Sequence, residues 1–294
     1  MTISPEAVRL PERRHPVSSA PPVPSAPPTP VDVSLTANLP SIKVDGIVVH
    51  LVDAGHAKAL IADSAGRRPN RPLAVASINL DHLHHFGSSR GPTSRATKNQ
   101  QVARVEWLNL IDGAPIAKHA ERVKGTFYPK LSGSDLVLSI LEEASLRGQS
   151  VGFLGGSPEV TDSLVSRIAK EWPSIRFAGH WTPARTELSS TVDAQRVARE
   201  IAAQDVDILV VCLGKPRQED WIEEFGAMTG AGVLLAFGAV VDFLAGRVSR
   251  APQWVSRAGM EWAWRLALEP RRLARRYLIQ GPPAYLALRR STNG

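Results

Sequence analysis

The sequence predicts an α/β protein with a Rossmann-like, mostly parallel sheet covered by helices. The first observation is that short, wholly apolar strands alternate with amphipathic helices through the middle of the chain. Strands that are apolar at every position are typical of a parallel sheet buried on both faces. The second is that this region lies between a proline-rich beginning and an arginine-rich end. We therefore expect a disordered tail at 1–40, an α/β domain at 41–246 and an appendage at 247–294.

The expected elements follow from apolar runs and from the turn residues between them. A β-rich stretch at 43–50 precedes a helix at 53–61, with Asp53 near its N-cap. Residues 87–104 are polar and rich in glycine and serine, which predicts a loop or mobile insert. Further strands are expected at 73–78, 105–111, 151–154, 175–178, 207–213 and 232–237, and helices at 134–146, 159–171, 192–203 and 218–228.

The two flanking segments differ from the domain in composition. Residues 21–30 read PPVPSAPPTP, which predicts an extended, disordered tail. Residues 247–294 carry ten arginines against two glutamates, so their charge of 10 − 2 = +8 accounts for the whole net charge of +7. Arginine on one helix face with Trp and Leu on others is typical of an interfacial helix, so we predict a basic helical appendage that contacts the membrane. The alternative is that its apolar face packs on the domain and its arginines are solvated.

Composition excludes some sites and leaves others open. The chain of 294 residues has one cysteine, Cys212, so it can form no intramolecular disulfide and no cysteine-based zinc site. Cys212 lies in an apolar run and is expected to be a small buried hydrophobe. The positive charge points to an anionic partner, although an arginine-rich proteome explains it equally well. No apolar run approaches ~20 residues and no apolar signal core begins the chain, which predicts a cytoplasmic protein without a spanning helix.

Polar and glycine-rich residues follow five of the expected strands. Because ligands of parallel α/β sheets bind at the carboxyl ends of strands, these residues are the candidates for a site. They are Ser77 and Asn79, Asp112 and Gly113, Gly155 and Gly156, Gly214 to Glu219, and Gly238 to Asp242.

Each cluster has a chemical and a structural interpretation. Gly155 and Gly156 open a helix and suit an anionic or polar ligand, or else make a tight turn. Pro216 and Glu219 suit the first turn of a helix. That structural role does not explain Gln218, whose amide could bind a base or a sugar. A carboxylate such as Asp112 can act as general base on a hydroxyl, whereas the dipeptide alone favours an Asp-Gly turn.

Signals for a metal are weak. His82, His84 and His85 match no zinc spacing and predict a surface helix with histidines, and no Asp-x-Asp motif is evident. We therefore predict no metal site and no cofactor.

In their order, these clusters resemble the WecG/TagA/CpsF family, which is glycosyltransferase family 26. The resemblance runs from about Ile42 to Leu278. The segments that carry it are Ser77 to Asp81, Asp112-Gly113, Gly133 to Asp135, Phe153 to Gly156, Leu213 to Glu219, Gly238 to Gly246, Arg250 to Pro252, Glu261 to Leu266 and Glu269 to Arg272. The chain departs from the family pattern in having Ser77 in place of threonine, which keeps the hydroxyl, and Cys212 in place of glycine.

The resemblance implies an inverting, metal-independent transferase. Its donor would be a UDP-sugar, often UDP-N-acetylmannosamine or an acidic relative, and its acceptor a saccharide on undecaprenyl diphosphate. Asp112 would be the catalytic base, and the substrates would be bound by Ser77, Asn79, Gly113, Gly155, Gly156, Gly214, Pro216, Gln218, Glu219, Asp242, Arg250 and Arg265. The basic appendage would contact the inner face of the cytoplasmic membrane.

Two other classes of function stay open at this point. One is a dinucleotide-dependent oxidoreductase, which the chain fits poorly because it lacks a full glycine fingerprint. The other is a non-enzymatic basic module that binds a membrane or a nucleic acid. The arginine-rich end suits such a module, but it leaves the clusters at the strand ends unexplained, so we expect no nucleic-acid partner.

Overall fold

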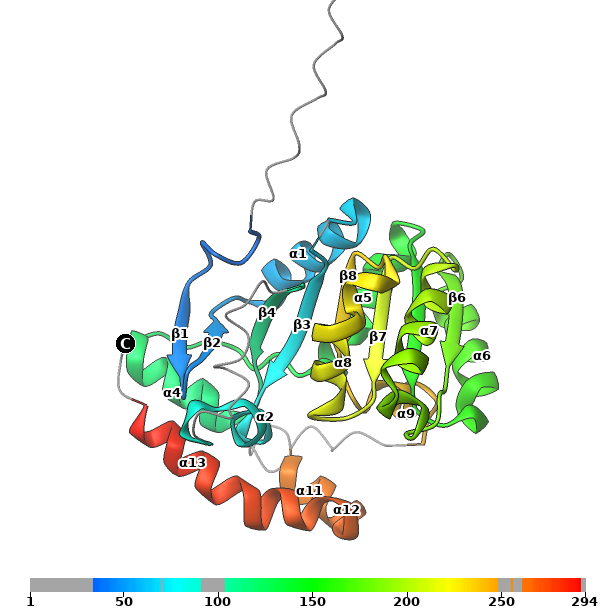
Figure 1. Ribbon diagram of the computed structural model, residues 1–294. Helices are drawn as coiled ribbons and strands as arrows, with labels where there is room; N and C mark the ends of the chain where they lie inside the picture. The colour runs from blue at the N-terminus through cyan, green and yellow to red at the C-terminus, as the bar shows by residue number, and fades with distance from the viewer. Residues whose placement is uncertain (1–33, 70, 91–103, 248–254, 256–260, 292–294) are drawn as a thin grey trace, which may run out of the picture. The chain divides into compact units, whose positions relative to one another are not determined.

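The protein is built around one mixed sheet (Figure 1). The computed structural model describes residues 34–69, 71–90, 104–247, 255 and 261–291. Within these residues, eight strands pair in the order β1-β2-β4-β3-β8-β7-β5-β6. All neighbours are parallel except the antiparallel pair β1 and β2, which confirms the predicted fold class. The strands are β1 (Ser41–Val44), β2 (Ile47–His50), β3 (Leu73–Ile78), β4 (Glu106–Ile111), β5 (Ser150–Gly155), β6 (Arg176–Trp181), β7 (Ile208–Cys212) and β8 (Val233–Ala236).

Helices cover both faces of the sheet, so two apolar cores form. One core receives side chains from α2 (Leu80–Phe86), α4 (Ala114–Lys124), α7 (Thr191–Ala202), α8 (Arg217–Phe225) and α13 (Gly281–Arg290). The other receives them from α1 (Ala54–Arg67), α5 (Gly133–Leu146), α6 (Thr161–Glu171) and α9 (Val240–Leu244). The central strands are buried along their whole length, as expected for a sheet covered on both sides.

The order of the strands produces a crevice between β5 and β7. The chain leaves β5 through α6 toward β6, and it leaves β7 through α8 in the opposite direction toward β8. Right-handed crossovers then place α6 and α8 on opposite faces, in agreement with the two cores. Such a reversal opens a crevice at the carboxyl ends of the two strands, where ligands of doubly wound sheets bind.

Three elements differ from the prediction. The β-rich stretch at 43–50 is a hairpin, because Asp45 and Gly46 both adopt positive φ and suit a two-residue turn. Helix α4 was not predicted because it begins with Gly113 and has Pro115 in its first turn, residues that resemble a turn but also suit a helix start. Helix α9 is only five residues long and was not predicted either.

The described chain extends beyond the predicted domain at its beginning. Residues 1–33 and 91–103 lie outside the described residues. However, Ser34 and Thr36 of the predicted tail donate hydrogen bonds to the buried carboxylate of Glu106, at 2.6 Å and 2.8 Å from their hydroxyls. These bonds hold the pKa of Glu106 below its usual value although burial alone would raise it. Ser34 and Thr36 are therefore tied to the start of β4.

The C-terminal segment is helical where it is described. It contains α11 (Glu261–Leu268), α12 (Pro270–Ala274), a π-helical segment at Arg275–Gln280 and α13. Figure 1 shows α13 lying beside α2 and α4, and contacts join it to both. Leu273, Ala284 and Leu288 are buried, so one side of the segment packs on the domain.

At the amino ends of the parallel strands, Asp207 joins three elements. Its carboxylate accepts from the Ser150 backbone amide at 2.7 Å and from the Ser150 hydroxyl at 3.0 Å. It also accepts from Arg68 at 2.6 Å and from Arg176 at 3.4 Å. The start of β5, the end of α1 and the edge strand β6 are thereby tied to the start of β7.

We expect Asp207→Ala to lower the free energy of unfolding by about 1–3 kcal/mol, because it leaves the buried Ser150 amide without its acceptor. Urea denaturation measures the change. Glu142→Ala, which removes an exposed carboxylate from α5, is the control and should change stability by less than about 0.5 kcal/mol. A loss below about 1 kcal/mol for Asp207→Ala would contradict this role.

Candidate functional site

The candidate site begins with two polar side chains on neighbouring strands. Ile78 of β3 pairs with Ile111 of β4, so Asn79 and Asp112 follow side by side. The Asn79 amide nitrogen donates a hydrogen bond of 2.9 Å to Oδ2 of Asp112. The Asn79 side-chain oxygen caps α2 by accepting from the His82 backbone amide at 3.2 Å. Asp112 itself is half-buried, so its second oxygen can meet a substrate.

Lys215, in the loop after β7, joins this pair, although the sequence predicted no role for it by itself. Its Nζ donates to the Ser77 carbonyl oxygen at 2.8 Å and lies 3.4 Å from the Asn79 side-chain oxygen. Burial lowers the pKa of Lys215, an effect that attraction to Glu219 and Asp112 opposes. Lys215 lies inside the segment Gly214 to Glu219, but that segment offered no sign that the lysine reaches β3.

Ser77 faces into the protein. It is buried, and its hydroxyl donates to the Leu131 carbonyl oxygen at 3.3 Å. The predicted substrate-binding residue therefore bonds to the loop before α5 in this structure, and its backbone carbonyl is the group that meets Lys215.

Gln218 and Glu219 are also buried, beneath the strand ends. The Gln218 amide nitrogen donates to the Ala236 carbonyl oxygen at 2.8 Å and to Oε1 of Glu219 at 3.0 Å. Gln218 is 1% exposed and Glu219 is 4% exposed. The structure thus places the amide that was expected to read a base or sugar against β8, where it joins α8 to the sheet.

His82 lies next to Glu219, and its burial corrects the prediction of a surface helix with histidines. Its Nδ1 lies 3.8 Å from Oε1 of Glu219. Burial raises the pKa of Glu219 to about 7, while the Lys215 ammonium acts in the opposite sense. Burial, reinforced by Lys215, holds the pKa of His82 well below its usual value. Asp81, one residue before His82, pairs with Arg276 of the C-terminal segment at 3.1 Å.

The glycine turn after β5 forms the other part of the site. Gly155 and Gly156 both have positive φ, and a Cβ on Gly155 would lie 2.6 Å from the Cys212 carbonyl oxygen. A Cβ on Gly156 would lie 2.8 Å from Val241 of α9, the helix that carries the half-buried Asp242. Glycine therefore allows the backbone to line the crevice between β5 and β7. Cys212 beneath it is buried, as predicted, and burial raises its pKa to about 12.

The structure brings most of the predicted residues to one edge of the sheet. Asp112 follows β4 and Gly155 ends β5, and the strands β3, β8 and β7 lie between them. With neighbouring strands about 4.8 Å apart, the two residues are about 19 Å apart along this edge. Gly113 precedes α4, Gly214 follows β7 and Pro216 precedes α8, all at this edge. Arg250 lies outside the described residues, and Arg265 belongs to α11, although the position of its side chain is not described.

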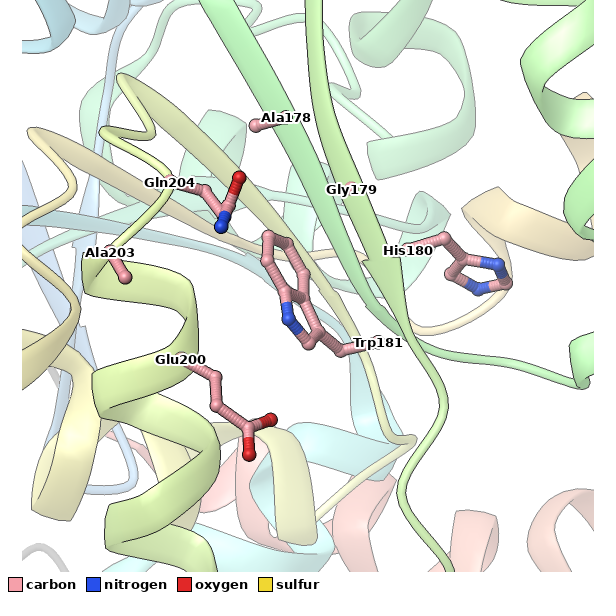
Figure 2. A pocket seen from close by; sticks show the side chains of 7 residues that line it. All are labelled: Ala178, Gly179, His180, Trp181, Glu200, Ala203 and Gln204. Atoms are coloured by element: carbon pink, nitrogen blue, oxygen red, sulfur yellow. The ribbon is translucent and has the colours of Figure 1, made fainter.

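A separate hollow lies along the edge strand β6. Its volume is about 430 Å³, and α7 forms its other wall. Figure 2 shows the Trp181 indole turned toward Gln204 and Glu200, whereas His180 points to the other side of the strand. None of the predicted site residues lines it. We therefore place the candidate site at the carboxyl ends of the strands.

Two further properties concern metals and membranes. Among the described residues, no three His, Cys, Asp or Glu side chains are grouped so that they could hold a metal ion. In the same part of the chain, every helix is too short or too polar to cross a bilayer.

Comparisons with known proteins match most of the chain to one family. The model of the "Glycosyl transferase WecG/TagA/CpsF family" matches residues 42–293. An N-acetylglucosaminyldiphosphoundecaprenol N-acetyl-beta-D-mannosaminyltransferase of Bacillus subtilis (strain 168) is 29% identical over 166 residues, 56% of this chain and 62% of the relative. A protein of that name from Staphylococcus aureus (strain NCTC 8325 / PS 47) is 26% identical over 185 residues, 61% of this chain and 70% of the relative. The match thus spans less than two thirds of the length of the Bacillus protein.

We expect Glu219 to make stability depend on pH. Its pKa rises from 4.5 to about 7 on folding, so its contribution to stability is complete below pH 4.5 and is lost as the pH rises through 7. Between pH 4.5 and pH 8, the free energy of unfolding of the unmodified protein should fall by about 2–3 kcal/mol more than that of Glu219→Gln.

Urea denaturation of both proteins across this range tests the expectation. Glu224→Gln changes an exposed carboxylate on the same helix and should keep the original pH dependence. Equal pH dependence in the original protein and in Glu219→Gln would show that Glu219 is ionised throughout.

Proposed function

The chain belongs to the WecG/TagA/CpsF glycosyl transferase family, and we propose that it is an inverting, metal-independent transferase that uses a UDP-sugar. The proposed acceptor is a saccharide linked to polyprenyl diphosphate, because the Bacillus and Staphylococcus relatives are named for such an acceptor. The proposed sugar is of the N-acetylmannosamine type or a related uronic acid, since those relatives are named mannosaminyltransferases. The product would serve the synthesis of a cell-surface polysaccharide.

The observation that carries this proposal is the pair formed by Asn79 and Asp112. Among the residues that the structure describes, Asn79 supplies the side chain that bonds to Asp112, and it occupies Oδ2. Oδ1 is then the atom that accepts a proton from the acceptor hydroxyl. As the hydroxyl oxygen bonds to the anomeric carbon from one side, the bond from that carbon to the UDP phosphate breaks on the other. The configuration inverts, UDP leaves, and the proton remains on Asp112.

The crevice between β5 and β7 is the proposed place for the nucleotide. Gly155 and Gly156 let the backbone approach the uridine closely. The diphosphate would then extend along the strand ends past Gly214, so that the anomeric carbon bonded to it lies beside Asp112. This placement uses the rule that ligands of α/β sheets bind where the strand order reverses.

The C-terminal segment supports a location on the inner face of the cytoplasmic membrane. Leu278, Ile279, Tyr285 and Leu286 are between 44% and 66% exposed, and they recur after seven residues, about two helical turns. Trp262 and Leu268 of α11 are also about half exposed. Arg271, Arg275, Arg289 and Arg290 are exposed in the same segment. We call these ten side chains the docking surface.

This arrangement combines the two alternatives for the segment, which were packing on the domain and contact with a membrane. Ala284 and Leu288 pack on the domain, whereas the docking surface stays accessible. Arg275 is exposed, but the neighbouring Arg276 turns inward to Asp81. Apolar and aromatic side chains flanked by arginine suit an interface of anionic lipid.

We expect the purified full-length chain to release UDP from UDP-N-acetylmannosamine when a polyprenyl-diphosphate-linked N-acetylglucosamine is present. Asp112→Asn should lower turnover by ~10²–10⁴-fold, because it removes the proton acceptor and keeps the shape. Mass spectrometry of the lipid product and a UDP-release assay measure this. Asp162→Asn, an exposed position on α6, should leave turnover unchanged.

Three outcomes would contradict parts of the proposal. Near-normal turnover of Asp112→Asn would mean that the carboxylate is only a turn residue and not the base. Inhibition by EDTA that Mn²⁺ reverses would refute the metal-independent reaction. A melting temperature raised by NAD and not by UDP would favour an oxidoreductase, because a ligand stabilises the state that binds it.

We expect binding to vesicles that contain anionic lipid. Replacing Arg271, Arg275, Arg289 and Arg290 by glutamine should weaken binding by roughly 10³-fold, since each basic residue near an anionic surface contributes ~1 kcal/mol. Co-sedimentation measures the affinity, and neutral vesicles should bind less. Leu146→Ser with Val192→Ser, which removes exposed apolar residues elsewhere, is the control. If binding depends neither on lipid charge nor on these four arginines, the docking surface is not the membrane contact.

A further inference from the structure

We propose that Lys215 is a positioning residue that orients the Asn79 carboxamide and, through it, the Asp112 carboxylate. The inference rests on the proposed function, which makes Asp112 the base. Nζ of Lys215 lies 2.8 Å from the Ser77 carbonyl oxygen and 3.4 Å from Oδ1 of Asn79. Nδ2 of Asn79 lies 2.9 Å from Oδ2 of Asp112. A continuous chain of contacts thus runs from β7 to the end of β4.

Lys215 has the length that this contact requires. It follows β7, whereas Ser77 and Asn79 are at the end of β3, and β8 lies between the two strands. Two strand spacings are about 10 Å, so a long stem must cross the end of β8. Gly238 lies at that crossing, and a Cβ there would be 3.3 Å from the Gly214 Cα and 2.8 Å from Oε1 of Gln218. Glycine at 238 therefore leaves room for the loop that carries Lys215.

The contacts decide which end of the Asn79 carboxamide meets Asp112. A carboxamide has an oxygen that accepts and a nitrogen that donates, and it can rotate to exchange the two. Here the oxygen meets two donors, the His82 backbone amide at 3.2 Å and the Lys215 ammonium. The nitrogen is then directed at Asp112. In the rotated form, the Asn79 oxygen would face the carboxylate and its nitrogen would face the ammonium, and both contacts are repulsive.

Charge adds a second effect of Lys215. Its ammonium is close enough to Asp112 for mutual attraction, and Glu219 and Asp81 attract it as well. Arg276 is the cation that opposes them. Removing the ammonium should therefore disturb the geometry of the base and remove a positive charge from its surroundings while leaving the glycine turns intact.

The test uses Lys215→Met, which keeps the stem and removes the donors and the charge. We expect kcat to fall by ~10-fold and KM for the UDP-sugar to change by less than ~2-fold, because the nucleotide site is untouched. Asn79→Ser keeps a hydroxyl that can cap α2 but has no carboxamide. In that background, Lys215→Met should lower kcat by less than ~2-fold, since its target is absent. Lys170→Met, an exposed lysine on α6, is the control for loss of charge.

Melting temperatures of the same variants give a readout that does not need activity. If the two side chains touch, the double variant should melt ~2 °C or more above the value expected from adding the two single losses. Additive melting temperatures would overturn the contact, even in a chain that transfers sugar. Equal fold losses of kcat in both backgrounds would also overturn the inference, because Lys215 would then act without Asn79.

The two proposals can fail separately. If Lys215→Met keeps kcat within ~2-fold of the original value while melting temperatures are coupled, the contact is structural and the positioning role is refuted. If melting temperatures are coupled but the unmodified chain transfers no sugar, the proposed function fails and the contact between Lys215 and Asn79 stands.

Discussion

The parallel pairing of β3 with β4 is the constraint on which the site depends. Six consecutive residue pairs, ending with Ile78 and Ile111, are held in register, and the Asp112 backbone amide continues the ladder to the Ile78 carbonyl oxygen at 2.9 Å. A shift of one residue would send the side chain after each strand to the opposite face. Because most buried positions of both strands are apolar, that shift would also expose core residues. The same burial that stabilises the sheet therefore sets Asn79 against Asp112.

Around this pair, several ionisable groups lie close together. Lys215, Glu219 and His82 converge between β3, β7 and α2, where burial opposes the charged form of each. Their mutual attraction offsets part of the free-energy cost of burying the charges, since Lys215 favours ionisation of Glu219 and the carboxylates favour the charged lysine. Such clusters of displaced pKa values are found preferentially at functional sites.

Helix α2 connects this cluster to the C-terminal segment. Its first residue follows Asn79, and Asp81 in its first turn pairs with Arg276. The segment therefore has two roles in the structure. Ala284 and Leu288 anchor it to the domain, and Arg276 links it to the helix that Asn79 caps, while the docking surface stays exposed. In the proposed function, this geometry would bring a lipid-linked acceptor to the strand ends where Asp112 lies.

The amino-acid sequence by itself determined the α/β class, the order of the main strands and helices, and the residues that follow each strand. Apolar runs such as 73–78 and 151–154 identify strands because a sheet buried on both faces favours apolar residues at nearly every position. The same pattern identified Asn79 and Asp112 as strand-end residues. These are local properties, and local sequence suffices to predict them.

Tertiary structure decided which of these residues meet. Lys215 reaches Asn79 only because β7 and β3 are separated by a single strand, an arrangement that depends on the pairing of segments about 140 residues apart. Gln218 and Glu219 follow the same strand end as Gly214, yet α8 turns them into the protein. Burial of His82 likewise depends on Glu219 and Lys215 across the sheet. Long-range packing, which leaves no periodic trace in the sequence, determines which polar residues face a substrate and which are buried.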